Sequence, residues 1–258
     1  MLLDEKKYHS LRDILSTMNP ADIAAIFDDL DQACLPLLFR LLPKELAAET
    51  FVEMEPEAQE LLIQGFSDSE LKEVIDELYV DDAVDIVEEM PANVVQRILT
   101  QAEPDMRKQI NEILRYPEDS AGSIMTTEYV SLRPNMTVEE AILRIRRTGI
   151  DKETIYTCYV TRGHKLIGLT SVKDLLLCED DDATIESIMQ EHVITVGTLD
   201  DKEQVAQIFS KYNFLALPVV DTENRLVGIV TFDAAMDVME DEATEDMEKM
   251  ASMLPSEH

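Results

Sequence analysis

Apolar residues recur with a helical period through the first 115 residues of the chain. They follow three- and four-residue spacing in the segments 23–30, 71–78 and 94–99, which places them on one face of a helix. Proline and serine favour helix starts, and four such residues stand about 24 residues apart, so each interval holds two short helices. The starts are Pro20, Pro43, Ser67 and Pro91, and the turns within the intervals are at Asp31, Glu55, Val80 and Glu103. We therefore expect a right-handed stack of helical hairpins, with an irregular helical bundle as the alternative.

The pattern changes at residues 116–122, and the rest of the chain repeats itself. Ile124-Met125 opens one copy and Ile188-Met189 opens another; each continues with an amphipathic helix, two strands separated by a turn, and a closing helix. The expected helices are 138–147 and 202–212, the expected strands are 154–161, 165–170, 216–220 and 226–230, and the closing helices begin at Asp174 and Asp233. A duplicated α/β unit of this kind pairs with its twin and offers clefts between the copies, which indicates a ligand-sensing module.

Negative charge dominates the composition. The chain has 258 residues, 54 acidic and 22 basic, and its formal charge is −32. A field of this sign repels phosphate backbones and attracts cations, so we expect no nucleic-acid partner. Three widely spaced cysteines suit reduced thiols in the cytosol. There is neither a signal peptide nor an apolar run near the roughly 20 residues that span a bilayer, so we expect a soluble chain.

The repeated strand-turn-strand motif resembles a tandem pair of cystathionine-β-synthase (CBS) domains. The first copy carries Gly168-Leu-Thr-Ser-x-x-Asp174, and the second carries Leu217-Pro-Val-Val-Asp221 followed by Leu226-Val-Gly-Ile-Val-Thr231. The helical first half and the segments 78–85, 154–160 and 239–246 narrow the resemblance to the cytosolic part of the MgtE family of magnesium transporters and channels.

The resemblance implies an α+β multidomain fold, in which an N-terminal all-α helical-repeat superhelix precedes a tandem α/β CBS-domain pair and a C-terminal connecting helix. The corresponding ranges are 1–117 for the helical domain, 118–182 and 183–240 for the first and second CBS copies, and 241–258 for the connecting helix. In the family this helix leads to a transmembrane pore domain. We therefore expect either a soluble fragment or a stand-alone relative, acting at the cytoplasmic face of the cell membrane.

Acidic clusters are the candidate cation sites. Asp81 and Asp85 share one helix face and Asp82 is offset from it, a spacing at which like charges destabilise an isolated helix slightly. The helix dipole partly stabilises Asp81 and Asp82 without any ligand. Mg²⁺ is held by one or two carboxylates and several waters, so spacing alone does not identify its sites.

In MgtE proteins, Mg²⁺ binds between the helical domain, the CBS pair and the connecting helix. The matching positions here are Glu49, Asp81, Asp82, Asp85 and the carbonyl near Gly122, and on the other face Asp201, Glu203, Asp233, Asp237, Glu245 and Asp246. Two positions depart from the family pattern. Ala234 follows Asp233 where a second Asp is common, and Asn213 stands where an Asp is common, so we expect one or two sites to be weakened, shifted or lost.

Charge and resemblance together imply a gating mechanism. Two carboxylates 4 Å apart repel by roughly 1 kcal/mol in water and about 4 kcal/mol at an effective dielectric of 20. Bridging Mg²⁺ would favour a compact assembly, and in the family this compaction closes the pore at high internal Mg²⁺. We also expect a parallel homodimer through the CBS pairs, because such modules bury helix faces against a twin.

An adenine-nucleotide sensor is the alternative function. In CBS domains that bind nucleotides such as ATP, the Ser/Thr and Asp of the terminal motif contact phosphate and ribose. Ser171 and Asp174 fit this pattern, whereas Thr231 is followed by Ala234 at the Asp position. The hydroxyls of Ser171 and Thr231 would equally cap the following helices. Local positive charge for phosphates is available from Arg144, Arg146 and Arg147, which a solvated helix face explains as well.

We expect no enzymatic activity. The four histidines are scattered, and the chain has no Ser-His-Asp order, Gly-rich phosphate loop or zinc pattern. A purely structural helical-repeat adaptor is a further alternative, but it would not need a CBS pair.

Overall fold

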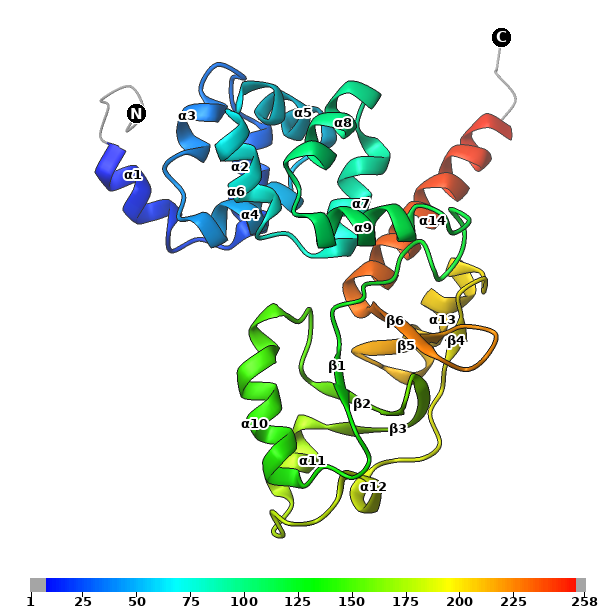
Figure 1. Ribbon diagram of the computed structural model, residues 1–258. Coiled ribbons are helices and arrows are strands. Elements are labelled where there is room, and N and C mark those ends of the chain that lie inside the picture. The colour runs from blue at the N-terminus through cyan, green and yellow to red at the C-terminus, as the bar shows by residue number, and fades with distance from the viewer. Residues whose placement is uncertain (1–7, 254–258) are drawn as a thin grey trace. The chain divides into compact units, whose positions relative to one another are not determined.

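The computed structural model describes residues 8–253, apart from the side chains at 151, 245, 246, 248 and 250–253. The chain divides into two compact units, one up to Ile110 and one from Asn111 onward. Helices alone build the first unit, and the second combines helices with two small sheets (Figure 1).

The first unit is a succession of short helices. They are α1 (Tyr8–Leu15), α2 (Pro20–Asp28), α3 (Leu35–Phe39), α4 (Lys44–Val52), α5 (Pro56–Gly65), α6 (Asp68–Ile75), α7 (Val80–Glu89), α8 (Ala92–Gln101) and α9 (Pro104–Ile113). Pro20 is the first residue of α2, and Ser67 caps α6 in a reciprocal arrangement with Glu70. Alternate helices pack together, α2 on α4, α4 on α6, α6 on α8 and α3 on α5. This packing confirms the stack of helical hairpins over the irregular bundle.

The second unit repeats one topology. Its elements are β1 (Val130–Leu132), α10 (Val138–Thr148), a 3₁₀ turn η1 (Gly149–Asp151), β2 (Thr157–Arg162), β3 (Lys165–Ser171), α11 (Val172–Leu177), α12 (Ile185–Ile188), β4 (Val196–Gly197), α13 (Lys202–Tyr212), β5 (Ala216–Val220), β6 (Leu226–Thr231) and α14 (Phe232–Met253). Each copy forms a three-stranded sheet, in which the first two strands are parallel and the last two antiparallel. The duplication predicted from the sequence is confirmed.

Two predicted boundaries in the first copy were wrong for local reasons. The strand predicted from residue 154 begins at Thr157, because the Thr154 hydroxyl accepts a hydrogen bond from the Tyr156 N–H at 3.3 Å and turns the chain before the strand. The closing helix predicted from Asp174 begins at Val172, since Ser171 is its N-cap.

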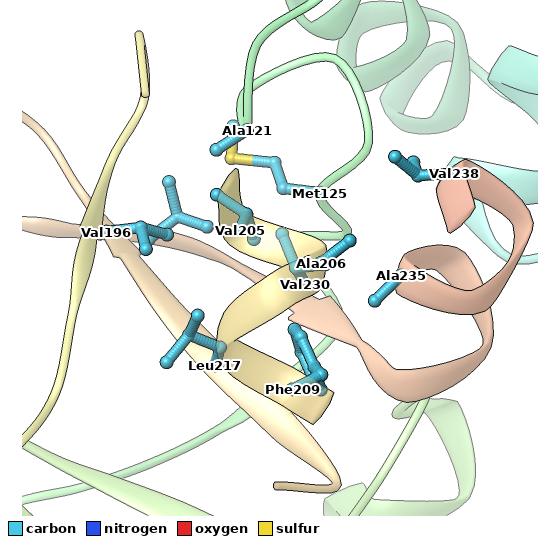
Figure 2. Close-up of a cluster of buried hydrophobic side chains, with 11 residues drawn as sticks. Ala121, Met125, Val196, Val205, Ala206, Phe209, Leu217, Val230, Ala235 and Val238 are labelled. Atoms are coloured by element: carbon cyan, nitrogen blue, oxygen red, sulfur yellow. The ribbon is translucent and has the colours of Figure 1, made fainter. Parts of the chain in front are cut away.

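The opening segment of each copy packs in the other copy. Met125, which opens the first copy, contacts Gly228 of β6, and Met189, which opens the second, contacts Gly168 of β3. Backbone hydrogen bonds hold each opening segment in the other copy. Thr126 and Ile229 exchange two N–H···O=C hydrogen bonds, and so do Leu169 and Gln190. The core of the second copy therefore contains residues of the first (Figure 2), namely Ala121 and Met125 among Val196, Val205, Ala206, Phe209, Leu217, Val219, Val230, Ala235 and Val238.

Candidate cation and nucleotide sites

The acidic residues predicted in the first unit come from two helices. Asp81 and Asp82 occupy the first turn of α7, and Asp85 follows one turn later and is exposed. The opposite face of α7 is buried in the hairpin stack, and Asp81 itself is partly buried, with its Oδ1 atom inaccessible to solvent. Glu49 is exposed on α4, a helix that packs on α2 and α6.

Backbone contacts bring Gly122 beside the start of α13. The Gly122 N–H donates to the Thr198 carbonyl at 2.9 Å, and Ser120 and Asp201 form an antiparallel bridge. Only glycine fits at residue 122, because a Cβ atom would lie 2.5 Å from the ring of Tyr116 and 2.9 Å from the Thr198 carbonyl oxygen. Two predicted cation ligands, the carbonyl near Gly122 and the carboxylate of Asp201, thus lie on two neighbouring backbone segments.

Asp201 has a structural role that leaves one oxygen for a ligand. It is the N-cap of α13, and its Oδ1 accepts a hydrogen bond from the Gln204 N–H at 3.0 Å. Glu203 is exposed in the first turn of the same helix. A cation at Oδ2 of Asp201 would lie at the helix N-terminus, where the second negative charge of Glu203 offsets the unfavourable dipole.

The start of α14 lies farther along α13. Phe232 contacts Phe209 with ring centroids 6.4 Å apart, and Phe209 is two turns, roughly 10 Å, from the N-terminus of α13. Asp233 is therefore separated from Asp201 and Glu203. Asp233 and Asp237 are exposed on α14, spaced one turn apart, whereas the predicted ligands Glu245 and Asp246 lie outside the described side chains.

The two departures from the expected acidic pattern have structural explanations. Asn213 ends α13 in the left-handed conformation, with φ of 54°, which Asn tolerates better than most residues. An aspartate there would place a negative charge at the negative end of the helix dipole. Ala234 packs against the core of the second copy, where a carboxylate would be desolvated.

The predicted nucleotide motif caps a helix in the first copy only. The Ser171 hydroxyl accepts from the Asp174 N–H at 3.0 Å, and the Ser171 N–H donates to Asp174 Oδ2 at 3.4 Å, which completes a capping box. The Ser171 hydroxyl also donates to Asp174 Oδ2 at 2.7 Å. Thr231 is buried, and its hydroxyl has no hydrogen-bond partner among the described residues. The capping interpretation is thus confirmed for Ser171 and wrong for Thr231.

Sequence reasoning missed a carboxylate pair in the first copy. Carboxylate oxygens of Glu128 and Glu153 lie within 4.8 Å of each other, and the Glu153 N–H donates to the Glu128 carbonyl at 3.0 Å. At 4.8 Å two charges repel by roughly 1 kcal/mol in water, which a divalent cation would relieve. The residues flank the helix α10 from opposite ends in sequence, so neither spacing nor periodicity indicated that they meet.

Comparison with known proteins identifies the family. Residues 18–119 match the MgtE intracellular N domain, and residues 121–179 and 185–241 each match the CBS domain. A crystal structure of the cytosolic domain of the Mg²⁺ channel MgtE in complex with ATP superposes with a TM-score of 0.86 and 38% identity, over 92% of this chain and 96% of that one. The chain belongs to the MgtE family. A second crystal structure, the soluble part of a magnesium transporter, has a TM-score of 0.85 and 32% identity, over 94% of this chain and 95% of that one.

Curated MgtE relatives match along nearly the whole chain. The magnesium transporter MgtE of Thermus thermophilus is 39% identical over 97% of this chain, and that of Bacillus subtilis is 31% identical over 98%. The chain spans 56% of each relative's length. These MgtE relatives are transporters, which confirms the expectation of a non-enzymatic chain. Within residues 8–253, no helix combines the length and apolar character needed to cross a bilayer.

Proposed function

We propose that this chain is the cytosolic, Mg²⁺-responsive regulatory part of a magnesium transporter. The observation that carries the proposal is its agreement, over 92% of the chain, with the cytosolic domain of the Mg²⁺ channel MgtE. The formal charge of −32 supports it, because a surface of this sign concentrates cations. The attached pore domain and the location at the cytoplasmic face of the membrane are parts of the same proposal.

Electrostatic repulsion supplies the mechanism. Asp81 and Asp85 of the first unit and Asp201 of the second carry like charges, and each pair brought to 4 Å costs about 1 kcal/mol in water and about 4 kcal/mol at an effective dielectric of 20. Mg²⁺ bound between such carboxylates removes this cost. High internal Mg²⁺ therefore favours a compact arrangement that closes the pore through the connecting helix, by as much as the ion prefers that state.

Small-angle scattering tests the ion response. We expect the radius of gyration to fall when millimolar Mg²⁺ is added at constant ionic strength, and the response to weaken in Asp81→Asn/Asp85→Asn. The matched control is Asp22→Asn/Glu57→Gln, which removes two charges from the first turns of α2 and α5. An unchanged radius in Mg²⁺, or equal effects of the two double variants, would contradict the proposal.

A homodimer through the second unit completes the regulatory assembly. Large apolar side chains are exposed on its closing helices: Leu176 and Leu177 of α11 are 63% and 69% exposed, and Phe232 and Met236 of α14 are 45% and 42% exposed. Full burial of such a side chain contributes about 1.5–3 kcal/mol, so a parallel twin would be stabilised by covering them. Sedimentation equilibrium should show a dimer that Leu176→Ser/Leu177→Ser weakens; a monomeric wild type would refute it.

Nucleotide sensing is the second candidate function. It is favoured by the ATP present in the related channel domain and by the Ser171 and Asp174 motif of the first copy. ATP binding, followed by calorimetry with and without Mg²⁺, should be lost in Asp174→Asn and retained in Asp181→Asn, which removes an equal charge from the exposed linker. Binding that survives Asp174→Asn would remove this motif from the site.

A further inference from the structure

A hollow lined by arginines opens on the first CBS copy. Its volume is about 410 Å³, within the range of small-molecule pockets. The lining comes from the loop after β1 and from one face of α10, and it comprises Arg133, Asn135, Met136, Glu140, Leu143, Arg144 and Arg147. None of these residues belongs to the predicted cation ligands or to the Ser171 and Asp174 motif. Arg144 and Arg147 are two of the three arginines that the sequence offers as positive charge for phosphates, and the hollow therefore places them in a site apart from that motif.

The guanidinium groups of this hollow make no ion pair with a carboxylate of the described part of the chain. Some arginines elsewhere are paired with carboxylates: Arg40 pairs with Glu70 at 2.7 Å, and Arg162 with Glu186 at 2.6 Å. Among the residues that the structure describes, none offers Arg133, Arg144 or Arg147 a carboxylate within ion-pairing distance. Three arginines without a carboxylate partner thus line one hollow, in a chain with more than two acids for every base.

Two side chains at the hollow are held by the backbone. Arg144 Nε donates to the Ser131 carbonyl at 2.9 Å, which fixes the guanidinium and leaves its terminal amino groups for a ligand. Glu140, the acidic residue in the lining, accepts the Thr137 N–H at 3.1 Å in the capping box of α10. The carboxylate is therefore engaged at the start of the helix, while the basic side chains are spread along the hollow.

The surrounding charge has the same sign. Residues 130–173 contain eight Lys and Arg and four Asp and Glu, a formal charge of +4, whereas the rest of the chain carries −36. An anion is therefore attracted to this segment of the first copy and repelled by the rest of the chain. Guanidinium groups bind phosphate oxygens bidentately, and Met136 and Leu143 add apolar surface for an organic group. We propose that this hollow binds a small phosphorylated molecule through Arg133, Arg144 and Arg147.

Titration with pyrophosphate tests the site. Isothermal calorimetry of the chain with sodium pyrophosphate, without divalent cations, should show one saturable site that weakens as NaCl rises. Arg133→Gln/Arg147→Gln, in which both residues are exposed, should lower the affinity at least about tenfold. Phosphorus NMR of the same samples should show line broadening that this double variant removes.

Two controls distinguish specific binding in the hollow from general electrostatic attraction to the positive segment. Arg146→Gln/Lys165→Gln removes two exposed positive charges from the same copy outside the hollow and should change the affinity less than about threefold. Asp174→Asn should leave pyrophosphate binding unchanged. The proposal is overturned by the absence of saturation up to roughly 10 mM, by equal losses in the two double variants, or by loss in Asp174→Asn, which would place the anion at the predicted nucleotide motif.

Discussion

The exchange of opening segments between the copies predicts that Gly228→Ala destabilises the second unit. A Cβ atom at residue 228 would lie 2.7 Å from Met125 Sδ and 2.8 Å from the Thr126 carbonyl oxygen. The thioether can move, but the carbonyl accepts the Ile229 N–H at 2.9 Å, so relief of the second contact would weaken the bridge that holds the exchanged segment.

The expected cost follows from these contacts. Overpacking of this kind costs about 1–3 kcal/mol, and a weakened backbone hydrogen bond adds about 1 kcal/mol. Replacing glycine also reduces the conformational entropy of the unfolded chain, which raises the free energy of unfolding by about 0.4–1 kcal/mol. We therefore expect the free energy of unfolding to fall by about 2 kcal/mol. Met125→Ala alone should cost about 2–5 kcal/mol, and the double variant should cost about 1 kcal/mol less than the sum, because the contact with Sδ is absent.

Hydrogen exchange is the suitable assay because the two compact units need not unfold together. Amides of β5 and β6 should exchange roughly 30-fold faster in Gly228→Ala, while those of α4 and α6 should be unaffected. Gly197→Ala is the matched control, since its Cβ atom would meet the Asp200 carboxylate at an ordinary 3.4 Å. Unchanged protection in β6, or additive costs in the double variant, would refute the exchanged arrangement.

Three further predictions concern local interactions. The Arg40 guanidinium and the Ser67 cap lower the pKa of Glu70 to about 2. Glu70→Gln should therefore lower the free energy of unfolding by about 1 kcal/mol at neutral pH, after allowance for solvent screening. Urea midpoints of the two proteins should converge between about pH 4.5 and pH 2, as Glu70 of the wild type is protonated. Ser171→Ala should lower the free energy of unfolding by about 1 kcal/mol through loss of a cap. Thr231→Val should leave it unchanged or raise it, because the buried hydroxyl has no partner among the residues that the structure describes, and a destabilising Thr231→Val would reveal one. Burial raises the pKa of Cys158 to about 12, so in a thiol-labelling assay at pH 8 it should react only on unfolding, and rapid labelling of the native protein would contradict this placement.

Sequence patterns predicted elements well where one residue decides a boundary. Pro20 begins α2 and Ser67 caps α6, because proline and serine each suit one position of a helix. In the second copy, the predicted ranges 202–212 and 216–220 are those of α13 and β5. The helix α13 is bounded by Asp201, an N-cap, and Asn213, a left-handed C-cap, so local chemistry is enough to define it.

The partner of each opening segment could not be predicted in this way. Thr126 pairs with Ile229, far away in the sequence, and the repeat contains an Ile-Met pair and a glycine in both copies. Spacing does not tell whether a methionine covers the glycine of its own copy or of the other. The same limit applies to the arginine hollow, because Arg133 and Arg147 line one hollow only when α10 packs against β1.

The segment before the first copy, at Asp119, and the helix α14 both contact the second copy, and this arrangement leads to a last prediction. The Lys202 N–H donates to the Asp119 carbonyl at 3.0 Å, and α14 is anchored by Ala235 and Val238 in the same cluster as Val205. Packed cores transmit displacement because they have few voids, so the cation that we propose at the start of α13 would act on both segments. Val205→Ala should therefore lower the free energy of unfolding by about 2 kcal/mol and also alter the Mg²⁺ dependence of the expected compaction, measured by scattering. Val160→Ala, in the core of the first copy, should lower the free energy of unfolding by a similar amount and leave that dependence unchanged. Equal shifts of the Mg²⁺ midpoint in the two variants would mean that stability, rather than the core of the second copy, governs the response.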